Sequence, residues 1–231
     1  YRFKMDGNSQ YNIYTTTGTN YYNYIYYPSY SDITNNQLYS AQMSGTTATG
    51  YAFNIYYPSY TTIVGNSIKD VVNAYYWYGY YVYYGSYIDV NNNVSDNVKM
   101  NGANYMYNWY IYYPTGLKCN GNTSNNNYCA GSYLYNFYIY YGSIGTYAWN
   151  EFQDNIITNN VAVTYNYSTY IYYYNGTNHF KINRNFIVGN KATSTTGYHY
   201  NYWYYLNNYQ VVGNVVAGNT ANSHYLYIYS G

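Results

Sequence analysis

The chain has 231 residues, of which 49 are tyrosine, and its formal net charge is +1 with only 6% charged residues. This low charge excludes the basic surface that a phosphate backbone requires, so nucleic acid is not an expected partner. No apolar stretch approaches the length of a membrane-spanning helix. Leucine is scarce, while tyrosine, asparagine, threonine and glycine, which favour strands and turns over helices, occur in every segment.

The first recurring element is a short tyrosine-rich strand that ends in a turn. Four copies read like Tyr-Ile-Tyr-Tyr-Pro-Ser and cover residues 24–29, 54–59, 81–86 and 110–115. Residues 138–143 and 170–175 keep the strand but lengthen the connection that follows it. Alternating β-branched and aromatic residues before Pro or Gly predict a strand followed by a tight turn.

The second element is an asparagine that recurs every 27 to 33 residues, with an apolar residue three positions earlier. The residue directly before it is Gly or Asn in six of the eight copies. A fixed register within such a period indicates one supersecondary unit stacked repeatedly. The eight asparagines are Asn8, Asn36, Asn66, Asn93, Asn122, Asn155, Asn185 and Asn214.

These patterns predict an all-β fold, a parallel β-solenoid of about eight coils with about 29 residues per coil. It runs through residues 1–231 as one continuous unit, and its uncapped ends suggest a segment of something longer or an assembling unit. A helical solenoid is excluded because no segment has apolar residues at helical spacing. Each buried asparagine is expected to bond through its amide to the copies above and below, forming a ladder.

Charged residues recur four positions before the ladder asparagines, where an outward orientation is expected. Opposite charges on neighbouring strands attract modestly, so we expect a charge ladder that helps to fix the register between coils. Its members are Lys4, Asp32, Asp89, Lys118, Glu151 and Lys181.

The tyrosines of the recurring strand also align between copies. The first column is a candidate face for binding or assembly, because tyrosine offers a large rigid contact area with a polar tip. It consists of Tyr26, Tyr56, Tyr83, Tyr112, Tyr140 and Tyr172. The second column points inward or lies at the corner before Pro or Gly, and it consists of Tyr27, Tyr57, Tyr84, Tyr113, Tyr141 and Tyr173.

The repeat resembles the right-handed parallel β-helix repeat family, whose members combine a Gly-Ile-Tyr strand with an Asn-Asn-x-Ile-x-x-Asn segment. Residues 156–160, 187–190 and 216–219 match the second asparagine of that pattern. The resemblance covers essentially the whole chain. It implies a right-handed β-helix, and the family includes polysaccharide lyases and epimerases, phage tailspikes and adhesin-like surface proteins.

Chemistry-bearing residues are few. The family's enzymes need clustered carboxylates with a basic partner, and here only Glu151, Asp154 and His179 could meet on adjacent coils. We therefore expect no catalytic site, no cofactor and no metal, since the two cysteines have no nearby histidine. Cys119 and Cys129 are either a disulfide or two buried free thiols.

Of four glycosylation sequons, two begin at ladder asparagines, whereas Asn166 and Asn175 are predicted in a variable arc and a turn where a glycan fits. The sequence thus predicts a non-catalytic structural protein of an extracellular filament, sheath or cell-surface layer. Its expected partner is a second copy of itself, met end to end through the solenoid ends and laterally through the tyrosines. The alternative is a β-helix that binds or degrades carbohydrate, with glycans as partners.

Overall fold

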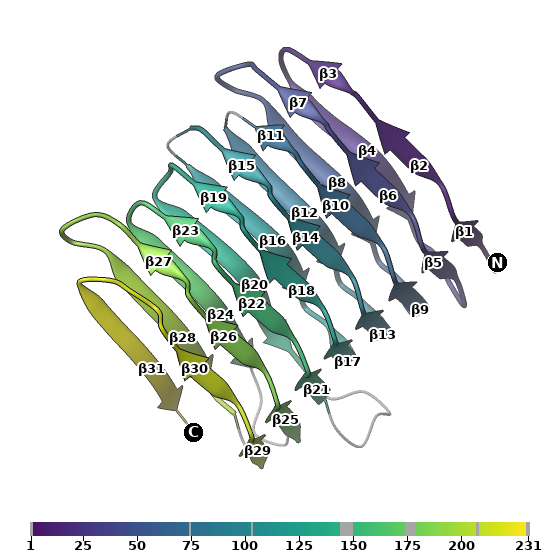
Figure 1. Cartoon of the computed structure of the whole chain (residues 1–231). Helices are drawn as coiled ribbons and strands as arrows, with labels where there is room; N and C mark the ends of the chain where they lie inside the picture. The colour runs from purple at the N-terminus through teal and green to yellow at the C-terminus, as the bar shows by residue number, and fades with distance from the viewer. Residues whose placement is uncertain are drawn as a thin grey trace.

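The structure is a computed structural model, and it describes residues 2–73, 75–102, 104–143, 150–173, 179–206 and 208–229. Every regular element in these residues is a β-strand, and every pairing between strands is parallel. The strands stack coil upon coil from the N-terminus at one end to the C-terminus at the other (Figure 1). No helix in the described ranges is both long and apolar enough to span a membrane.

Four parallel sheets run along the solenoid, and we name them A to D in the order in which the chain visits them. Sheet A contains β1 (Lys4–Asp6), β5 (Asp32–Thr34), β9 (Ser59–Val64), β13 (Ser86–Asn91), β17 (Thr115–Asn120), β21 (Asn150–Gln153), β25 (Phe180–Asn183) and β29 (Tyr209–Val212). Sheet B contains β2 (Ser9–Tyr11), β6 (Gln37–Tyr39), β10 (Ser67–Lys69), β14 (Val94–Asp96), β18 (Thr123–Asn125), β22 (Ile156–Thr158), β26 (Phe186–Val188) and β30 (Val215–Ala217).

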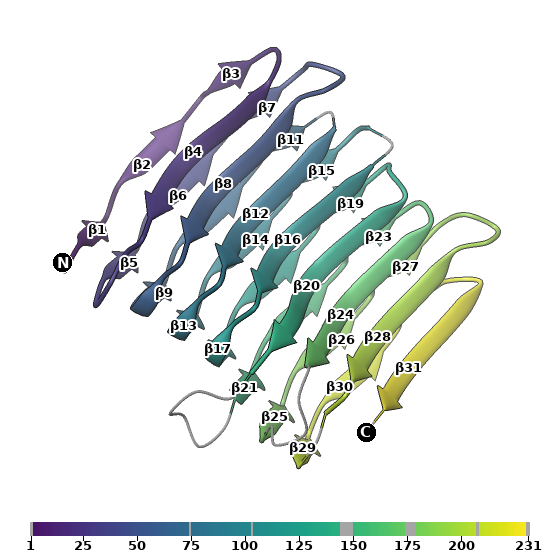
Figure 2. The ribbon, with the colours of Figure 1, turned by 180° about the vertical axis from the view of Figure 1, so that it is seen from behind.

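The other two sheets complete each coil. Sheet C contains β3 (Tyr14–Thr15), β7 (Gln42–Met43), β11 (Val72–Asn73), β15 (Lys99–Met100), β19 (Tyr128–Cys129), β23 (Val161–Ala162) and β27 (Lys191–Ala192). Sheet D contains β4 (Thr19–Tyr26), β8 (Thr49–Tyr56), β12 (Tyr76–Tyr83), β16 (Tyr105–Tyr112), β20 (Tyr133–Gly142), β24 (Tyr165–Tyr173), β28 (Tyr198–Tyr204) and β31 (Ser223–Tyr229). Figure 2 shows the long strands of sheet D side by side.

The parallel β-solenoid predicted from the repeat is confirmed, with a small correction to the coil count. Among the described residues, seven coils contribute a strand to all four sheets, and the last contributes strands to sheets A, B and D alone. The structure therefore has about seven complete turns instead of eight. The segment that follows each ladder asparagine is regular, because it forms the strands of sheets B and C.

The asparagine ladder between sheets A and B is confirmed in full. Each amide Nδ2 donates to the Oδ1 of the asparagine in the next coil at 2.8–3.1 Å. The same Oδ1 also accepts the backbone N–H of the previous rung, and Nδ2 donates to a carbonyl of the previous coil, as Asn66 does to Ile33. From Asn36 to Asn185 the rung is buried, so one side chain satisfies several backbone groups at each of these bends.

The residue before each rung has a left-handed backbone, with φ between 54° and 69°. Gly and Asn adopt this conformation at the lowest steric cost, which explains their preference at this position. The two exceptions are Asp154 and Arg184 on adjacent coils. Their side chains form a bidentate ion pair, with both N···O distances at 2.7 Å.

A second asparagine ladder lies at the corner between sheets B and C. It runs through Asn127, Asn160, Asn190 and Asn219, and Nδ2 donates to Oδ1 at 2.9–3.1 Å at each step. In the first coils the same corner holds the apolar residues Ala41, Val71 and Val98. The core between the sheets contains an internal stack of Phe53, Tyr80, Trp109 and Phe137 at 4.4–5.2 Å between ring centroids. It also contains a buried polar run on sheet D, in which Asn108 donates to Asn136 and Asn136 donates to Asn166, both at 3.1 Å.

Candidate functional site

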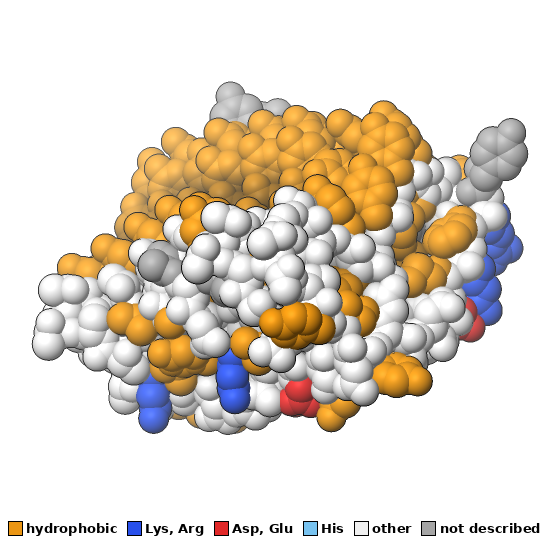
Figure 3. Space-filling view, turned by 90° about the horizontal axis from the view of Figure 1, so that it is seen from above, with side chains coloured by type: hydrophobic (Ala, Val, Ile, Leu, Met, Phe, Trp, Pro, Cys, Tyr) orange, Lys and Arg blue, Asp and Glu red, His pale blue; other side chains and the backbone are white. Residues whose placement is uncertain are grey.

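The outer surface of sheet D carries four columns of tyrosine side chains, which together we call the tyrosine face. They are Tyr76, Tyr105, Tyr133, Tyr165 and Tyr198; then Tyr21, Tyr51, Tyr78, Tyr107, Tyr135, Tyr167, Tyr200 and Tyr225; then Tyr81, Tyr110, Tyr138, Tyr170, Tyr202 and Tyr227; and finally Tyr26, Tyr56, Tyr83, Tyr112, Tyr140, Tyr172, Tyr204 and Tyr229. Figure 3 shows hydrophobic-class side chains, a class that includes tyrosine, massed along one long side of the molecule.

The sequence predicted the last of these columns and missed the other three. The column that begins at Tyr81 lies two residues before Tyr83 in each copy, so strand alternation alone could have revealed it. The two remaining columns are hidden by an irregularity in the middle of most strands of sheet D, although β28 alternates without one. In β12 both Gly79 and Tyr80 are buried, and Gly79 has no paired residue in β16, so the alternation of inward and outward residues shifts by one.

The rings of a column lie nearly parallel. In the column from Tyr21 to Tyr225, neighbouring ring centroids are 4.6–5.1 Å apart with interplanar angles of 4–18°. This spacing follows the distance of about 4.8 Å between hydrogen-bonded strands. Each ring therefore covers the flat faces of its neighbours and presents its edge and its hydroxyl group outward.

Rings of neighbouring columns pack edge to face, with their planes nearly perpendicular. Tyr107 meets Tyr110 edge-on at 5.1 Å and 89°, and Tyr135 meets Tyr138 at 5.2 Å and 79°. Edge-to-face pairs of this kind contribute about 0.5–1.5 kcal/mol each beyond the area they bury. Burial in this packing raises the pKa of Tyr78 to about 12 and that of Tyr170 to about 12, so the face stays neutral over the physiological range.

The second predicted column lies at the corner between sheets D and A, one of the two placements that the sequence left open. Its residues have left-handed backbones, with φ of 51–55° from Tyr27 to Tyr141. Tyr84 and Tyr113 stack at 4.7 Å and 1°. Tyr173 was wrongly assigned to this column, because the pairing shifts by one residue at Gly142 and turns Tyr173 into the core, where it is fully buried.

The predicted charge column lies in register on sheet A. Lys4 pairs with Asp32, Asp89 with Lys118, Lys118 with Glu151, and Glu151 with Lys181. Lys181 Nζ lies 3.9 Å from a Glu151 oxygen. In the first coil, however, the ammonium of Lys4 lies 3.1 Å from Asp6, and Asp32 is 3.7 Å from Arg2. Ion pairs near a protein surface contribute about 0–1 kcal/mol each.

The residues considered for catalysis do not form a carboxylate pair. Glu151 meets Lys181, and Asp154 is held by Arg184. His179 accepts a hydrogen bond from Asn150 through its backbone carbonyl at 2.8 Å. Within the described residues, no group of three or more His, Cys, Asp or Glu side chains is arranged to hold a metal ion.

The structure corrects one further candidate site and decides between the two alternatives for the cysteines. Asn166 was expected in a variable arc, but it lies on β24, is fully buried, and donates to the carbonyls of Asn160 and Lys191 at 2.9 and 3.0 Å. It cannot carry a glycan in the folded state. Asn175 lies outside the described residues. Cys119 and Cys129 are free, because they are buried on different sheets, in β17 and β19, and form no disulfide.

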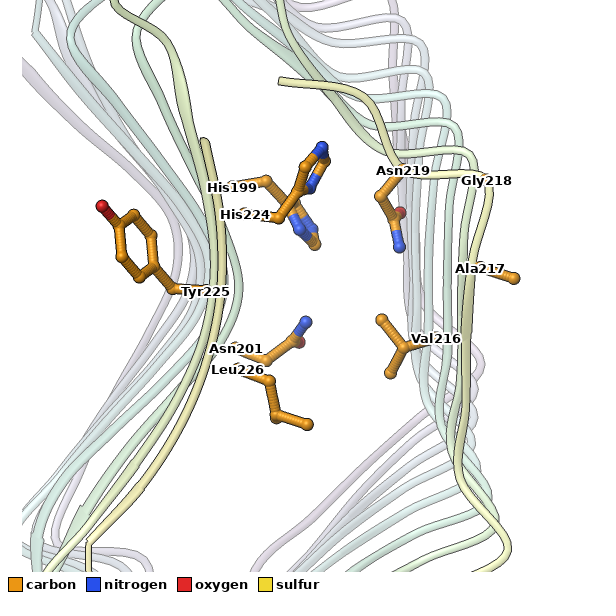
Figure 4. A pocket seen from close by; sticks show the side chains of 9 residues that line it. All are labelled: His199, Asn201, Val216, Ala217, Gly218, Asn219, His224, Tyr225 and Leu226. Carbon is orange, nitrogen blue, oxygen red and sulfur yellow. The ribbon is translucent and has the colours of Figure 1, made fainter. Parts of the chain in front are cut away.

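A cavity of about 260 Å³ lies between sheets B and D at the last coil. Figure 4 shows His199, His224 and Asn201 pointing into it from one wall and Val216 and Asn219 from the other, while Tyr225 points away. His199 Nε2 is 2.8 Å from Ser168 Oγ inside the core. Among the described residues that line the cavity, none is acidic.

His199 makes the stability of the fold depend on pH. Burial and the neighbouring His224 lower the pKa of His199 from 6.5 to about 4. The unfolded chain then binds this proton first, so stability is lost as the pH falls from about 6.5 toward 4, by about 3 kcal/mol in total. Urea titrations at pH 7 and pH 4.5 measure this loss. The variant His199→Asn, which copies the neighbouring Asn166 of the same column, should lose much less, and an equal loss in both proteins would contradict the assignment.

Comparison of the chain with protein-family models, with curated protein sequences and with solved structures returned no match. The tyrosine face is therefore interpreted from its own geometry.

Proposed function

We propose that the protein is a non-catalytic structural unit of an extracellular filament, sheath or cell-surface layer, and that a second copy packs laterally against its tyrosine face. The observation that carries the proposal is the face itself, a broad, uncharged and rigid surface of stacked tyrosines on sheet D. The extracellular location rests on the resemblance to adhesin-like β-helix proteins alone.

The area of the face supports a lateral contact. Eight strands of mostly seven to ten residues form sheet D. At about 4.8 Å between strands and about 3.3 Å per residue, the face measures roughly 1,000 Å². Two copies would bury roughly 2,000 Å² in total, which lies within the range of stable protein interfaces. Tyrosine is also enriched at such interfaces and in their energetic centres.

The surface chemistry suits a second copy of the same face. No Lys, Arg, Asp or Glu lies in the described parts of sheet D, so two faces can meet without burying a charge. Rings within a column follow the strand spacing, and neighbouring columns lie two or three residues apart along each strand. The columns therefore form parallel ridges, and identical ridges on two copies can interdigitate. Phenol hydroxyls at the contact can bond to each other, which satisfies the polar tip of each ring.

The stacking favours this proposal over the carbohydrate-binding alternative. A sugar ring packs best on an exposed aromatic face, but the column rings cover each other's faces at about 5 Å. Only ring edges and hydroxyls remain outward. A glycan array on which the wild-type chain binds strongly, with loss of binding in tyrosine-face variants, would favour the alternative.

Axial stacking belongs to the same proposal. At the last coil Val216, Leu226 and Ile228 have 40–59% of their surface exposed. A further coil of the same shape would cover these side chains and continue the parallel sheets.

A charge in the edge column of the tyrosine face, on a strand midway along the solenoid, tests the lateral contact. Tyr112 lies on β16 in the outermost column and is partly exposed, so the stem of a lysine can lie along the surface with its ammonium in water. In a face-to-face dimer that ammonium would be buried without a partner, which costs several kcal/mol. We expect Tyr112→Lys to weaken self-association at least 100-fold in sedimentation velocity measurements.

The matched control is Tyr39→Lys, the same chemical change on sheet B, where Tyr39 is 47% exposed. This variant should associate like the wild type. Both variants should keep the wild-type circular dichroism. A wild-type chain that stays monomeric at high concentration, or equal effects of the two lysines, would overturn the proposal.

A further inference from the structure

A second group of stacked tyrosines lies away from the tyrosine face. Tyr30, Tyr60 and Tyr87 follow the D-to-A corner on consecutive coils, and each has a left-handed backbone with φ of 47–53°. The rings of Tyr30 and Tyr60 lie 4.8 Å apart at 2°, and those of Tyr60 and Tyr87 lie 4.7 Å apart at 29°. The column stops there, because Gly116 occupies the position in the next coil, between Thr115 and Leu117.

These rings combine stacking with access to solvent. Tyr30 is 63% exposed and Tyr60 is 45% exposed. The backbone N–H of Tyr30 donates to Ser59 at 2.9 Å, which fixes the spacing between the two coils directly beside the rings. An oxidant in solution can therefore reach both phenols, and the protons released on oxidation can leave to water.

We propose that Tyr30 and Tyr60 form an oxidative modification site, where a peroxide-dependent oxidant joins the two rings into a dityrosine that covalently links neighbouring coils. Each phenol loses one electron and one proton and becomes a neutral phenoxyl radical. The two radicals form one carbon–carbon bond between ring positions ortho to the oxygens, and the two displaced ring hydrogens move to the oxygens. Two tyrosines and one hydrogen peroxide thus give one dityrosine and two waters.

The fold explains why this pair should react before pairs on the tyrosine face. A new ortho–ortho bond requires the two rings to tilt toward each other. On the face, rings such as Tyr78 and Tyr107 are held by perpendicular neighbours at 5.1–5.7 Å and cannot tilt freely. Tyr30 has open solvent on its outer side, so the ring can tilt while its backbone stays in place.

The inference goes beyond the proposed function and does not require the lateral contact. Tyr30 and Tyr60 lie outside sheet D, between β4 and β5 and in β9, so they stay accessible when two tyrosine faces meet. A bond between them would connect two coils that are otherwise held together by hydrogen bonds and packing. Oxidation would therefore make separation of these two coils along the solenoid axis more difficult.

The test treats the full chain with hydrogen peroxide and a haem peroxidase and maps cross-linked peptides by mass spectrometry, with dityrosine fluorescence as a second readout. We expect a Tyr30–Tyr60 cross-link within single chains. The cross-linked peptide pair should have a mass lower by two hydrogen atoms than the sum of the two free peptides. In Tyr60→Phe the ring stack remains but the phenol is lost, and Tyr30 and Tyr87 are then about 9.6 Å apart. After oxidation this variant should show less than one-tenth of the dityrosine fluorescence of the oxidised wild-type chain. Tyr87→Phe should keep the Tyr30–Tyr60 product.

Two results would overturn the inference. One is a Tyr30–Tyr60 yield that is no higher in the folded chain than in the chain unfolded in urea. The other is preferential coupling on the tyrosine face, for example between Tyr78 and Tyr107. Tyr112→Lys should give the same Tyr30–Tyr60 yield as the wild type, so a failure of lateral association and a failure of this coupling are separate results.

Discussion

Replacing Asn122 with alanine is expected to lower the free energy of unfolding by about 3–5 kcal/mol. The Oδ1 of Asn122 accepts both the backbone N–H and the amide of Asn93, at 3.0 and 3.1 Å. Its Nδ2 donates to the carbonyl of Val90 at 2.8 Å and to Asn155 at 3.1 Å. All these groups are buried, so alanine leaves several of them without a partner and without water. Urea unfolding measured by circular dichroism gives the loss.

Asn8→Ala is the matched control, because Asn8 is the first rung of the same ladder and is exposed. Its amide bonds to Asn36 at 2.8 Å, but water can replace it there. We expect a loss under about 1 kcal/mol. Equal losses at Asn8 and Asn122 would show that burial of the ladder does not govern its contribution.

Trp109→Ala is expected to destabilise the fold by about 3–5 kcal/mol, through lost burial and the cavity that it leaves. Trp109 is fully buried and stacks between Tyr80 at 5.1 Å and Phe137 at 4.4 Å. The surrounding strands are fixed by parallel pairing on both sides and can close little of the space. Thermal and urea unfolding measure the change.

Trp109→Phe separates packing from polarity at the same position. The indole N–H of Trp109 is buried and has no hydrogen-bond partner among the described residues. Phenylalanine removes this unsatisfied group and repeats the residue found in the next coil, Phe137. A loss below about 1.5 kcal/mol is expected, and a loss as large as that of alanine would contradict the view that stacking dominates here.

The fold could be predicted from the sequence because its determinants recur at fixed positions. Each ladder asparagine needs an inward apolar residue before it and a left-handed residue beside it, so the pattern marks every coil. The coil count was less predictable, since a final asparagine at Asn214 shows that a coil begins but not how many strands complete it. In the structure that coil lacks a strand in sheet C.

The tyrosine face was only partly predictable. Counting from the asparagines aligns Tyr83 with Tyr112, and strand alternation adds Tyr81. The column that contains Tyr78 depends on the buried pair Gly79 and Tyr80, where the alternation shifts by one residue. A sequence pattern of period two cannot show such a shift, because it is set by packing inside the coil.

The glycosylation hypothesis failed at Asn166, and the free-thiol alternative held for the two cysteines, for related reasons. A sequon reports three residues and not their burial, and Asn166 is an inward residue within a long strand. The two cysteines share one coil, but each occupies the apolar interior of a different sheet. Burial raises the pKa of Cys129 to about 12, so these thiols behave as core side chains.

The most direct test of the account is a structure of the assembled wild-type protein, determined by electron cryomicroscopy of particles in solution. We expect neighbouring copies to meet through sheet D, with the tyrosine columns of one copy packed against those of the other. Assemblies in which sheet D faces solvent, while copies meet through sheets A, B or C, would contradict it.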